Sequence, residues 1–240
     1  MKTSLCLVFL TGLLFIGCSI MKDNKYPITD HYNGDVFYNT PRISKGFFDF
    51  LKWRFTSKRK KESFPINNTP VKLQKKESTS PRITFINHAT LLIELEKYNI
   101  LTDPIWSDRC SPVSWAGPKR LRQPGVKFED LPPIHFVVIS HSHYDHLDLP
   151  TLKKLEKGHS PIFLVGLGLK ELLTNEGMTN VIEMDWWDEF KKDGTKITFV
   201  PARHWSKRTL LDTNKSLWGG FVFTEKKKNI FFAGDTGLSE

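Results

Sequence analysis

Five side chains that can bind a metal ion fall within eight residues of this 240-residue chain, directly after a short apolar stretch. The stretch Phe136-Val137-Val138-Ile139 is typical of a buried strand, and the run after it reads His141-Ser142-His143-Tyr144-Asp145-His146-Leu147-Asp148. Neutral imidazoles and carboxylates at this spacing suit a borderline cation such as zinc. A tight loop can turn His141 and His143 toward one ion while Asp145 and His146 face a second. A solvated polar loop is the alternative, but it does not explain three imidazoles separated by only one and two residues.

Two further candidate ligands follow apolar stretches later in the chain. His204 comes after Lys196-Ile197-Thr198-Phe199-Val200, within Pro201-Ala202-Arg203-His204-Trp205-Ser206. Asp235 comes after Asn229-Ile230-Phe231-Phe232-Ala233, within Gly234-Asp235-Thr236-Gly237. Each candidate therefore lies just past a predicted buried strand, as the histidine cluster does.

The order His-x-His-x-Asp-His, then a distal His, then an Asp in Gly-Asp-Thr-Gly resembles the metallo-β-lactamase superfamily. Additional motifs look like the N-acylphosphatidylethanolamine-hydrolysing phospholipase D group of that superfamily, and the resemblance runs from Arg82 to Gly237. These motifs are Asn87-His88-Ala89-Thr90, Leu101-Thr102-Asp103-Pro104-Ile105-Trp106, Gly117-Pro118-Lys119-Arg120, Asp130-Leu131-Pro132-Pro133, Asp185-Trp186-Trp187, His204-Trp205-Ser206 and Leu217-Trp218-Gly219-Gly220.

The resemblance implies an α/β fold of the metallo-β-lactamase type, a four-layer αββα sandwich with two zinc ions. It assigns His141, His143 and His204 to one zinc, Asp145 and His146 to the other, and Asp235 to a bridging position. Asp145 and His146 are also the candidate catalytic residues. The family's final histidine has no counterpart before Glu240, so the resemblance predicts an incomplete second half and either a fragment or a truncated gene product.

The order of predicted elements agrees with a layered α/β domain. Apolar stretches predict strands over residues 82–86, 90–95, 98–101, 134–139, 161–165, near 181, and over 196–200, 219–224 and 229–233. Helices are expected over 151–156, with Asp148 as a possible cap, and over 169–176, ended by Gly177.

The N-terminus is predicted to be a targeting segment. Lys2 precedes the apolar run Leu5 to Ile16, which suits a signal peptide and is short for a transmembrane helix. Phe15-Ile16-Gly17-Cys18 resembles a bacterial lipobox, although Phe15 replaces the usual Leu. We therefore expect a signal peptide over residues 1–17, a lipid-anchored polar and basic segment over 18–80 and the hydrolase domain over 81–240. Ordinary secretion and an uncleaved anchor are the alternatives.

The lipobox resemblance predicts a lipoprotein of the bacterial cell envelope that faces outward from the cytoplasm. The formal net charge is +9, and a basic stretch from Lys52 to Lys76 contributes much of it. This stretch can attract anionic headgroups or be a solvated linker, and no nucleic-acid motif accompanies it. Only Cys110 lies in the predicted domain, so no internal disulfide is expected.

Several residues near the predicted site have two interpretations each. Asp103 can orient a ligand imidazole or be a turn residue before Pro104, and His88 can line the cleft or pack in the core. Arg208 can hold a substrate phosphate. The tryptophans can form a wall for acyl chains or pack between layers: Trp186, Trp187, Trp205 and Trp218. The aromatic island over 47–55 can dock on the domain or on a membrane.

The predicted function is zinc-dependent hydrolysis of phosphodiester bonds, of phospholipase D type, on membrane phospholipids such as N-acylphosphatidylethanolamine. The membrane surface, reached through lipidated Cys18 and the basic segment, is the expected partner. Hydrolysis of a lactone or cyclic phosphodiester is one alternative. A lipid-anchored module that binds metal or lipid without turnover is the other.

Overall fold

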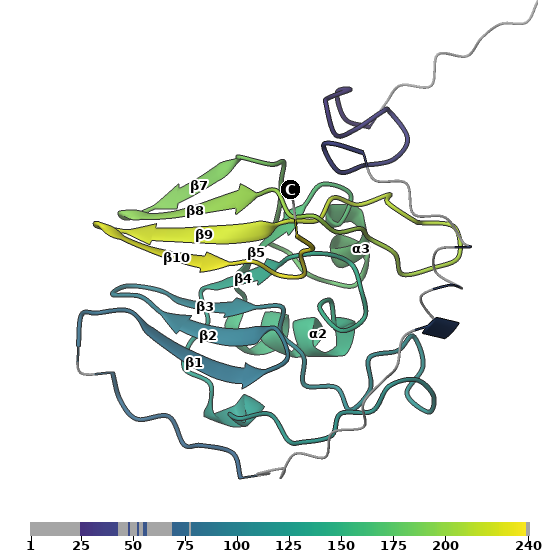
Figure 1. Ribbon diagram of the computed structural model, residues 1–240. Coiled ribbons are helices and arrows are strands. Elements are labelled where there is room, and N and C mark those ends of the chain that lie inside the picture. Colours follow the sequence, from purple (N-terminus) through teal and green to yellow (C-terminus); the bar gives the residue numbers. More distant parts are fainter. Residues whose placement is uncertain are drawn as a thin grey trace, which may run out of the picture.

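The computed structural model describes residues 25–42, 48, 52, 55–56, 69–76 and 78–238. Its strands form a six-stranded sheet in the order β1-β2-β3-β4-β5-β6 and a four-stranded sheet in the order β10-β9-β8-β7, and both are seen in Figure 1. The strands are β1 (Arg82–Asn87), β2 (Thr90–Glu94), β3 (Asn99–Thr102), β4 (Phe136–Ile139), β5 (Ile162–Gly166), β6 (Val181–Met184), β7 (Glu189–Lys192), β8 (Thr195–Val200), β9 (Gly220–Glu225) and β10 (Lys228–Phe232).

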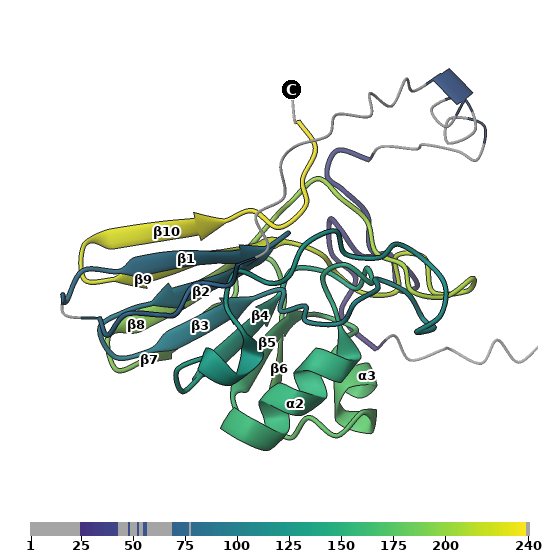
Figure 2. The ribbon, with the colours of Figure 1, turned by 90° about the horizontal axis from the view of Figure 1, so that it is seen from below.

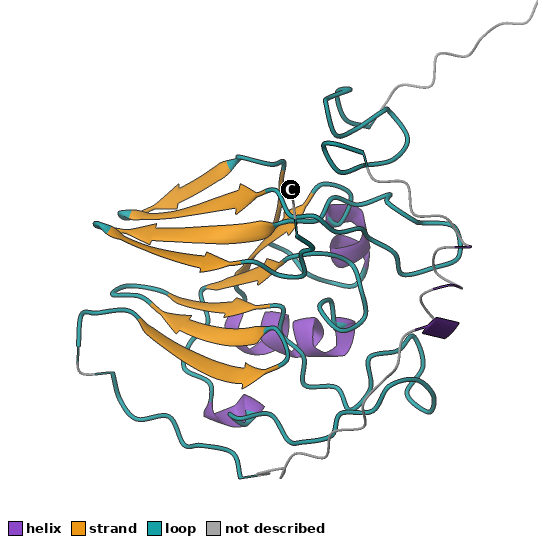
Figure 3. Ribbon diagram, viewed as in Figure 1, coloured by secondary structure: helices purple, strands orange, loops and turns teal. Residues whose placement is uncertain are grey.

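The six-stranded sheet changes from antiparallel to parallel pairing at β3. Strands β1, β2 and β3 pair antiparallel, whereas β3 to β6 pair parallel. Parallel neighbours need a crossover connection, and α2 (Leu149–His159) and α3 (Lys170–Asn175) provide the crossovers after β4 and β5. Figures 2 and 3 show both helices on the face of this sheet that points away from the four-stranded sheet.

The residues of β4 alternate between two hydrophobic cores. Phe136 and Val138 belong to the core between the two sheets, whereas Val137 and Ile139 belong to the core under α2 and α3. All four side chains are buried, because a central parallel strand is covered on both faces. The described residues thus form helix, sheet and sheet layers, which confirms the predicted α/β fold of the metallo-β-lactamase type.

Most predicted elements are present, with ends shifted by a few residues. The helix predicted over 169–176 is α3, and Gly177 follows it with φ +97°, as expected for a helix end. Strand β7 was not predicted, because Glu-Phe-Lys-Lys has no apolar alternation. Asp148 is the N-cap residue of α2, as predicted, but its carboxylate accepts hydrogen bonds from the backbone N–H groups of Trp106 and Ser107 rather than from the first turn of the helix.

Part of the segment that precedes the predicted domain packs on it. Tyr32 and Phe37 are buried in the core between the sheets, and the Phe37 N–H donates to the carbonyl of Asn214. The predicted domain start at residue 81 stays a prediction. The predicted signal peptide, Cys18 and most of the aromatic island lie outside the described residues. Among the residues that are described, no helix has the length and apolar character needed to cross a membrane.

Candidate metal centre

The predicted ligands come together at one end of the two sheets. His141, His143, Asp145 and His146 lie in the connection from β4 to α2, His204 follows β8 and Asp235 follows β10. The strands end at neighbouring positions, so side chains that are up to 94 residues apart in sequence reach one another. Two sets, one of His141, His143 and His204 and one of His141, His146 and Asp235, each have ligand atoms within 4.8 Å of one another.

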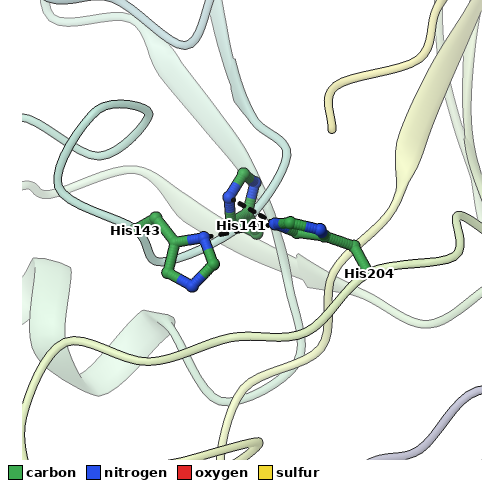
Figure 4. Close-up of side chains that lie close together, drawn as sticks. All are labelled: His141, His143 and His204. Atoms are coloured by element: carbon green, nitrogen blue, oxygen red, sulfur yellow. Dashed lines mark hydrogen bonds between the residues drawn. The ribbon is translucent and has the colours of Figure 1, made fainter. Parts of the chain in front are cut away.

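Three imidazoles form the first candidate site, and Figure 4 shows their rings pointing toward a common point. Nε2 of His204 lies 3.1 Å from Nε2 of His141 and 3.2 Å from Nδ1 of His143. Burial, together with neighbouring histidines, lowers the pKa of all three and brings that of His143 to about 4. Nε2 of His143 is buried without a hydrogen-bond partner. Converging neutral nitrogens fit a tetrahedral cation that prefers nitrogen ligands.

The second candidate site contains a histidine that the sequence interpretation favoured as a core residue. His88, Asp145 and His146 also have ligand atoms within 4.8 Å of one another. Nε2 of His88 lies 3.2 Å from Nε2 of His146 and 3.3 Å from Oδ2 of Asp145, and half of its side chain is exposed. The core interpretation of His88 is therefore wrong, and its position just past the end of β1 was the available signal.

Carboxylates complete this second group. Oδ1 of Asp235 lies 3.4 Å from Nε2 of His146, and Oδ2 of Asp145 lies 3.9 Å from the same nitrogen. The hydrogen bond with His88 is the main cause that lowers the pKa of Asp145, to about 2. A hydrogen bond with His146 likewise lowers the pKa of Asp235. Ionised carboxylates beside an imidazole are ligands that several divalent metals accept.

Asp103 positions two of the candidate ligands, as one of its two interpretations predicted. Its buried carboxylate accepts hydrogen bonds from Nδ1 of His146 at 2.7 Å and from the Ser140 hydroxyl at 2.6 Å. Because that hydroxyl gives its hydrogen to Asp103, its oxygen accepts the N–H at Nδ1 of His141, 2.9 Å away. His141 therefore presents an unprotonated Nε2 to the site, and the bond from Asp103 fixes the ring of His146 with its Nε2 directed there, as carboxylates do for metal-binding histidines.

The electrostatic balance at His146 differs from that at the other histidines. Burial opposes its protonation, but the hydrogen bonds and negative charges of Asp103 and Asp235 outweigh it and raise the pKa to about 10. A cation at Nε2 would have to replace a proton there. The two carboxylates that hold the proton would equally stabilise the positive charge of a metal.

Arg208 holds the metal-binding loop in shape. Its Nη1 donates to the carbonyls of Ser142 and Leu147 at 2.9 and 2.8 Å, and its guanidinium lies 4.0 Å from the centre of the Tyr144 ring. It thus bridges both ends of the turn that carries three candidate ligands. This geometry favours a structural role over the predicted contact with a substrate phosphate.

The four tryptophans have different roles. Trp218 is buried and donates to the carbonyl of Ala202, and Trp186 donates to the carbonyl of Trp218, so both pack between layers. Trp187 and Trp205 are 68% and 46% exposed. Of the four, Trp205 has a ring contact with a candidate ligand, edge-on to His143 with ring centres 4.5 Å apart. It is the best placed of them to form a wall beside the site.

A cavity of about 970 Å³ adjoins the metal-binding loop. Ser142 and Tyr144 contribute one wall, and Leu169 and Leu172 from the start of α3 contribute another. A volume of this size accommodates a drug-sized or lipid-like molecule. The cavity thus lies beside the loop that carries the candidate ligands, although none of those ligands lines it.

Comparisons with known proteins agree with this geometry. The family profile described as "Beta-lactamase superfamily domain" matches residues 98–240. N-acyl-phosphatidylethanolamine-hydrolyzing phospholipase D 1 of Caenorhabditis elegans is 42% identical over 167 residues, which are 65% of this chain and 47% of that protein. The mitochondrial protein of the same name from Saccharomyces cerevisiae is 43% identical over 143 residues, 58% of this chain and 30% of its own. The chain thus spans half or less of the length of these relatives.

Solved structures show the same fold. A possible metal-dependent hydrolase from Veillonella parvula aligns with a TM-score of 0.52 and 18% identity, over 68% of this chain and 65% of its own. A metallo hydrolase from Ignicoccus hospitalis aligns with a TM-score of 0.50 and 24% identity, over 66% and 62%. The match to the family profile covers more than half of the chain, and the chain therefore belongs to the β-lactamase superfamily domain family, with N-acylphosphatidylethanolamine-hydrolysing phospholipases D among its relatives.

Proposed function

We propose that this metallo-β-lactamase-fold hydrolase uses zinc to cleave phosphodiester bonds of membrane phospholipids such as N-acylphosphatidylethanolamine, in the manner of a phospholipase D. The observation that carries the proposal is the convergence of the three-histidine group with His146, Asp145 and Asp235. The names of the relatives at 42% and 43% identity support the choice of substrate.

The donor set supports zinc as the metal. Three neutral imidazole nitrogens are typical of catalytic zinc sites, which leave a position open for water. His141, His143 and His204 would hold one ion, and Asp145 and His146 a second, with Asp235 between them. When bound, zinc ions lower the pKa of a water molecule and offset negative charge on a phosphodiester.

The chain's own residues would orient the ligands and the attacking water. Asp103 and Ser140 fix the rings of His146 and His141 through their Nδ1 atoms, so that both Nε2 atoms stay directed at the site. The Asp145 side chain is 43% exposed, so its ionised carboxylate can accept a hydrogen bond from an attacking water and orient it. We therefore assign the catalytic roles to Asp145 and His146.

No side-chain nucleophile is needed for this reaction. Ser142 is 3% exposed, and its neighbours His141 and His143 belong to the group of candidate metal ligands rather than acting as a base for its hydroxyl. Burial raises the pKa of the Cys110 thiol, which makes the nucleophilic thiolate scarcer at neutral pH. Activated water remains the nucleophile that the site can deliver.

A substrate panel tests the proposal. The full chain, purified and supplied with zinc, is assayed on N-acylphosphatidylethanolamine, on a soluble phosphodiester, on a cyclic phosphodiester and on a lactone, with His141→Ala/His143→Ala as the inactive control. Release of phosphatidic acid from the phospholipid by the unmodified chain alone is expected. Preference for the lactone or the cyclic ester would replace the phospholipase assignment with another hydrolase activity. Metal binding without turnover of any substrate would favour a non-catalytic module.

We propose that the protein is attached to the outer face of a bacterial membrane through Cys18. A thioether-linked diacylglycerol with an amide-linked chain gives the multiple anchoring that one acyl chain lacks, and the basic segment adds attraction to headgroups. Labelled fatty acid should be incorporated into the unmodified protein and not into Cys18→Ser. Equal labelling of the two, or none in either, contradicts lipidation at this residue.

A further inference from the structure

Two loops next to the cavity expose large apolar side chains. In the loop between β3 and the 3-10 helix Phe128–Asp130, Trp115 is 79% exposed and Leu121 is 83% exposed. In the loop between β8 and β9, Leu210 and Leu211 are 89% and 90% exposed. Exposed apolar side chains scattered singly are common, whereas exposed apolar patches rimmed by polar residues mark interaction sites with proteins or membranes.

The two loops lie on the same side of the molecule. The cavity of about 970 Å³ is lined by Ser111 and Val113 from the first loop and by Thr209 and Asp212 from the second. Figures 1 and 2 show both loops extending beyond the strand ends that carry the candidate metal ligands. Trp115 follows the lining residue Ser114, and Leu210 and Leu211 lie between the lining residues Thr209 and Asp212, so these three apolar side chains border the same cavity.

Internal hydrogen bonds hold both loops in shape. In the first loop, Nε of Arg120 donates to the Ser107 carbonyl at 3.1 Å, and the buried Asp148 carboxylate accepts the Ser107 N–H at 3.0 Å. In the second, the Asp212 carboxylate accepts the N–H groups of Arg208 and Thr209 at 3.0 and 2.8 Å. The apolar tips are thus presented by ordered backbone, which lowers the entropic cost of using them in binding.

The charges on the two loops are predominantly positive. The first loop carries four cations and Asp108 between residues 107 and 122, and the second carries three cations and Asp212 between 207 and 215. Lys119 and Arg122 are exposed close to the apolar tips. Apolar tips flanked by cations match an anionic bilayer, in which hydrocarbon lies beneath a layer of phosphates.

We propose that loops 107–122 and 207–215 form a membrane-docking surface that inserts Trp115, Leu210 and Leu211 into the interface of an anionic bilayer. Docking in this orientation would place the cavity that both loops line against the lipid, next to the loop that carries the candidate metal ligands. The purpose of the docking rests on the proposed function, but the docking itself requires neither hydrolysis nor lipidation of Cys18.

Quenching of tryptophan fluorescence by brominated lipids tests insertion of the first loop. The vesicles contain phosphatidylglycerol and brominated phosphatidylcholine and no N-acylphosphatidylethanolamine, so the outcome is independent of the proposed activity. Trp115→Phe should remove roughly half or more of the quenching, because an inserted indole lies at the depth of the bromines. Trp187→Phe is the matched control, since Trp187 is similarly exposed but lies outside both loops. Equal losses in the two variants, or none in Trp115→Phe, overturn the proposal.

The second loop is tested by vesicle sedimentation. Leu210→Ser/Leu211→Ser should weaken binding to phosphatidylglycerol-containing vesicles roughly tenfold, because the apolar surface of two leucine side chains is no longer transferred from water into the bilayer. Ile83→Ser/Phe231→Ser, which removes two exposed apolar side chains from β1 and β10, should leave binding unchanged. Circular dichroism confirms that each variant is folded. Unchanged vesicle binding by the leucine variant overturns the proposal. The proposal is also overturned if the unmodified chain is a dimer that does not bind vesicles and the leucine substitutions dissociate that dimer.

Discussion

The carboxylate of Asp103 accepts a 2.7 Å hydrogen bond from Nδ1 of His146, with both side chains fully buried. Asp103 has φ +37°, a backbone conformation that costs free energy for a residue other than glycine. The strained backbone places the carboxylate where it reaches both His146 and Ser140. Asp103 therefore links the end of β3 to the metal-binding loop.

Asp103→Asn should weaken metal binding while the chain stays folded. The amide keeps the size of the side chain, but it removes the charge that fixes the His146 tautomer. Loss of such an outer carboxylate typically lowers metal affinity about 10–100-fold. Zinc titration against a competing chelator measures the change, with Asp108→Asn as the control because the Asp108 side chain is 74% exposed. Equal affinities in the two variants would argue against this role for Asp103.

Replacing two histidines of the first site should remove most of the bound metal. His141→Ala/His143→Ala leaves His204 as the one imidazole of that group, and a single nitrogen does not hold zinc tightly. Elemental analysis of the purified protein measures the loss. His135→Ala/His159→Ala, which changes two histidines outside the site, should retain the metal. The same metal content in both double variants would show that the ion is bound elsewhere.

Much of the fold could be predicted because apolar patterning is a local property. The continuous apolar run at β4 indicated a strand covered on both faces, and the order of motifs located the metal-binding loop. Strand β7 was not recognisable, because Glu-Phe-Lys-Lys lies at the edge of its sheet and is ordered by pairing with β8 rather than by its own pattern. Edge strands often carry charged side chains, especially lysines, which protect the open edge from pairing with another chain.

The site shows the same division between local and long-range information. The spacing of His141, His143 and His146 is visible in the sequence, and the structure places the ligand atoms of His141 and His143 within 4.8 Å of that of His204. The contact between His88 and Asp145 depends on how β1 and β2 place their connecting turn relative to a loop 57 residues away. Packing of Tyr32 and Phe37 against the core is similarly non-local, and the polar residues around them concealed it.

Stability should fall as the pH drops from neutral to about 5. Nδ1 of His135 accepts the Asn99 N–H at 3.0 Å, and Nδ1 of His159 accepts the Ile134 N–H at 3.2 Å, so each imidazole must be unprotonated there. Burial lowers the pKa of both histidines. Their folded pKa lies below the unfolded value, so the stabilisation is complete above about pH 6.5 and is lost as the unfolded chain binds protons.

Urea unfolding with chelator present measures this pH dependence without a contribution from metal release. His135→Asn/His159→Asn keeps an acceptor oxygen near the position of Nδ1 but does not titrate. The free energy of unfolding of this variant should decrease less between pH 7 and 5 than that of the unmodified chain. An unchanged decrease would assign the pH dependence to other groups.

Gly234 should be indispensable for the position of Asp235. It has φ +61°, and a Cβ at this position would lie 2.6 Å from Cβ of Ser140, the residue that joins Asp103 to His141. Gly234→Ala therefore forces either the chain before Asp235 or Ser140 to move, and it should cost about 2–4 kcal/mol of stability.

Gly177→Ala measures the cost of a positive φ alone, without a collision such as that between an added Cβ at position 234 and Ser140. Gly177 has φ +97°, but nothing lies within 4 Å of a Cβ added there, so its substitution should cost only about 1 kcal/mol and leave metal content unchanged. Urea unfolding and elemental analysis of the two variants give the comparison. Because Ser140 and Asp235 both belong to the metal centre, Gly234→Ala should lose metal as well as stability. If the two alanine variants lose equal stability and both retain metal, the close contact with Ser140 is not what places Asp235.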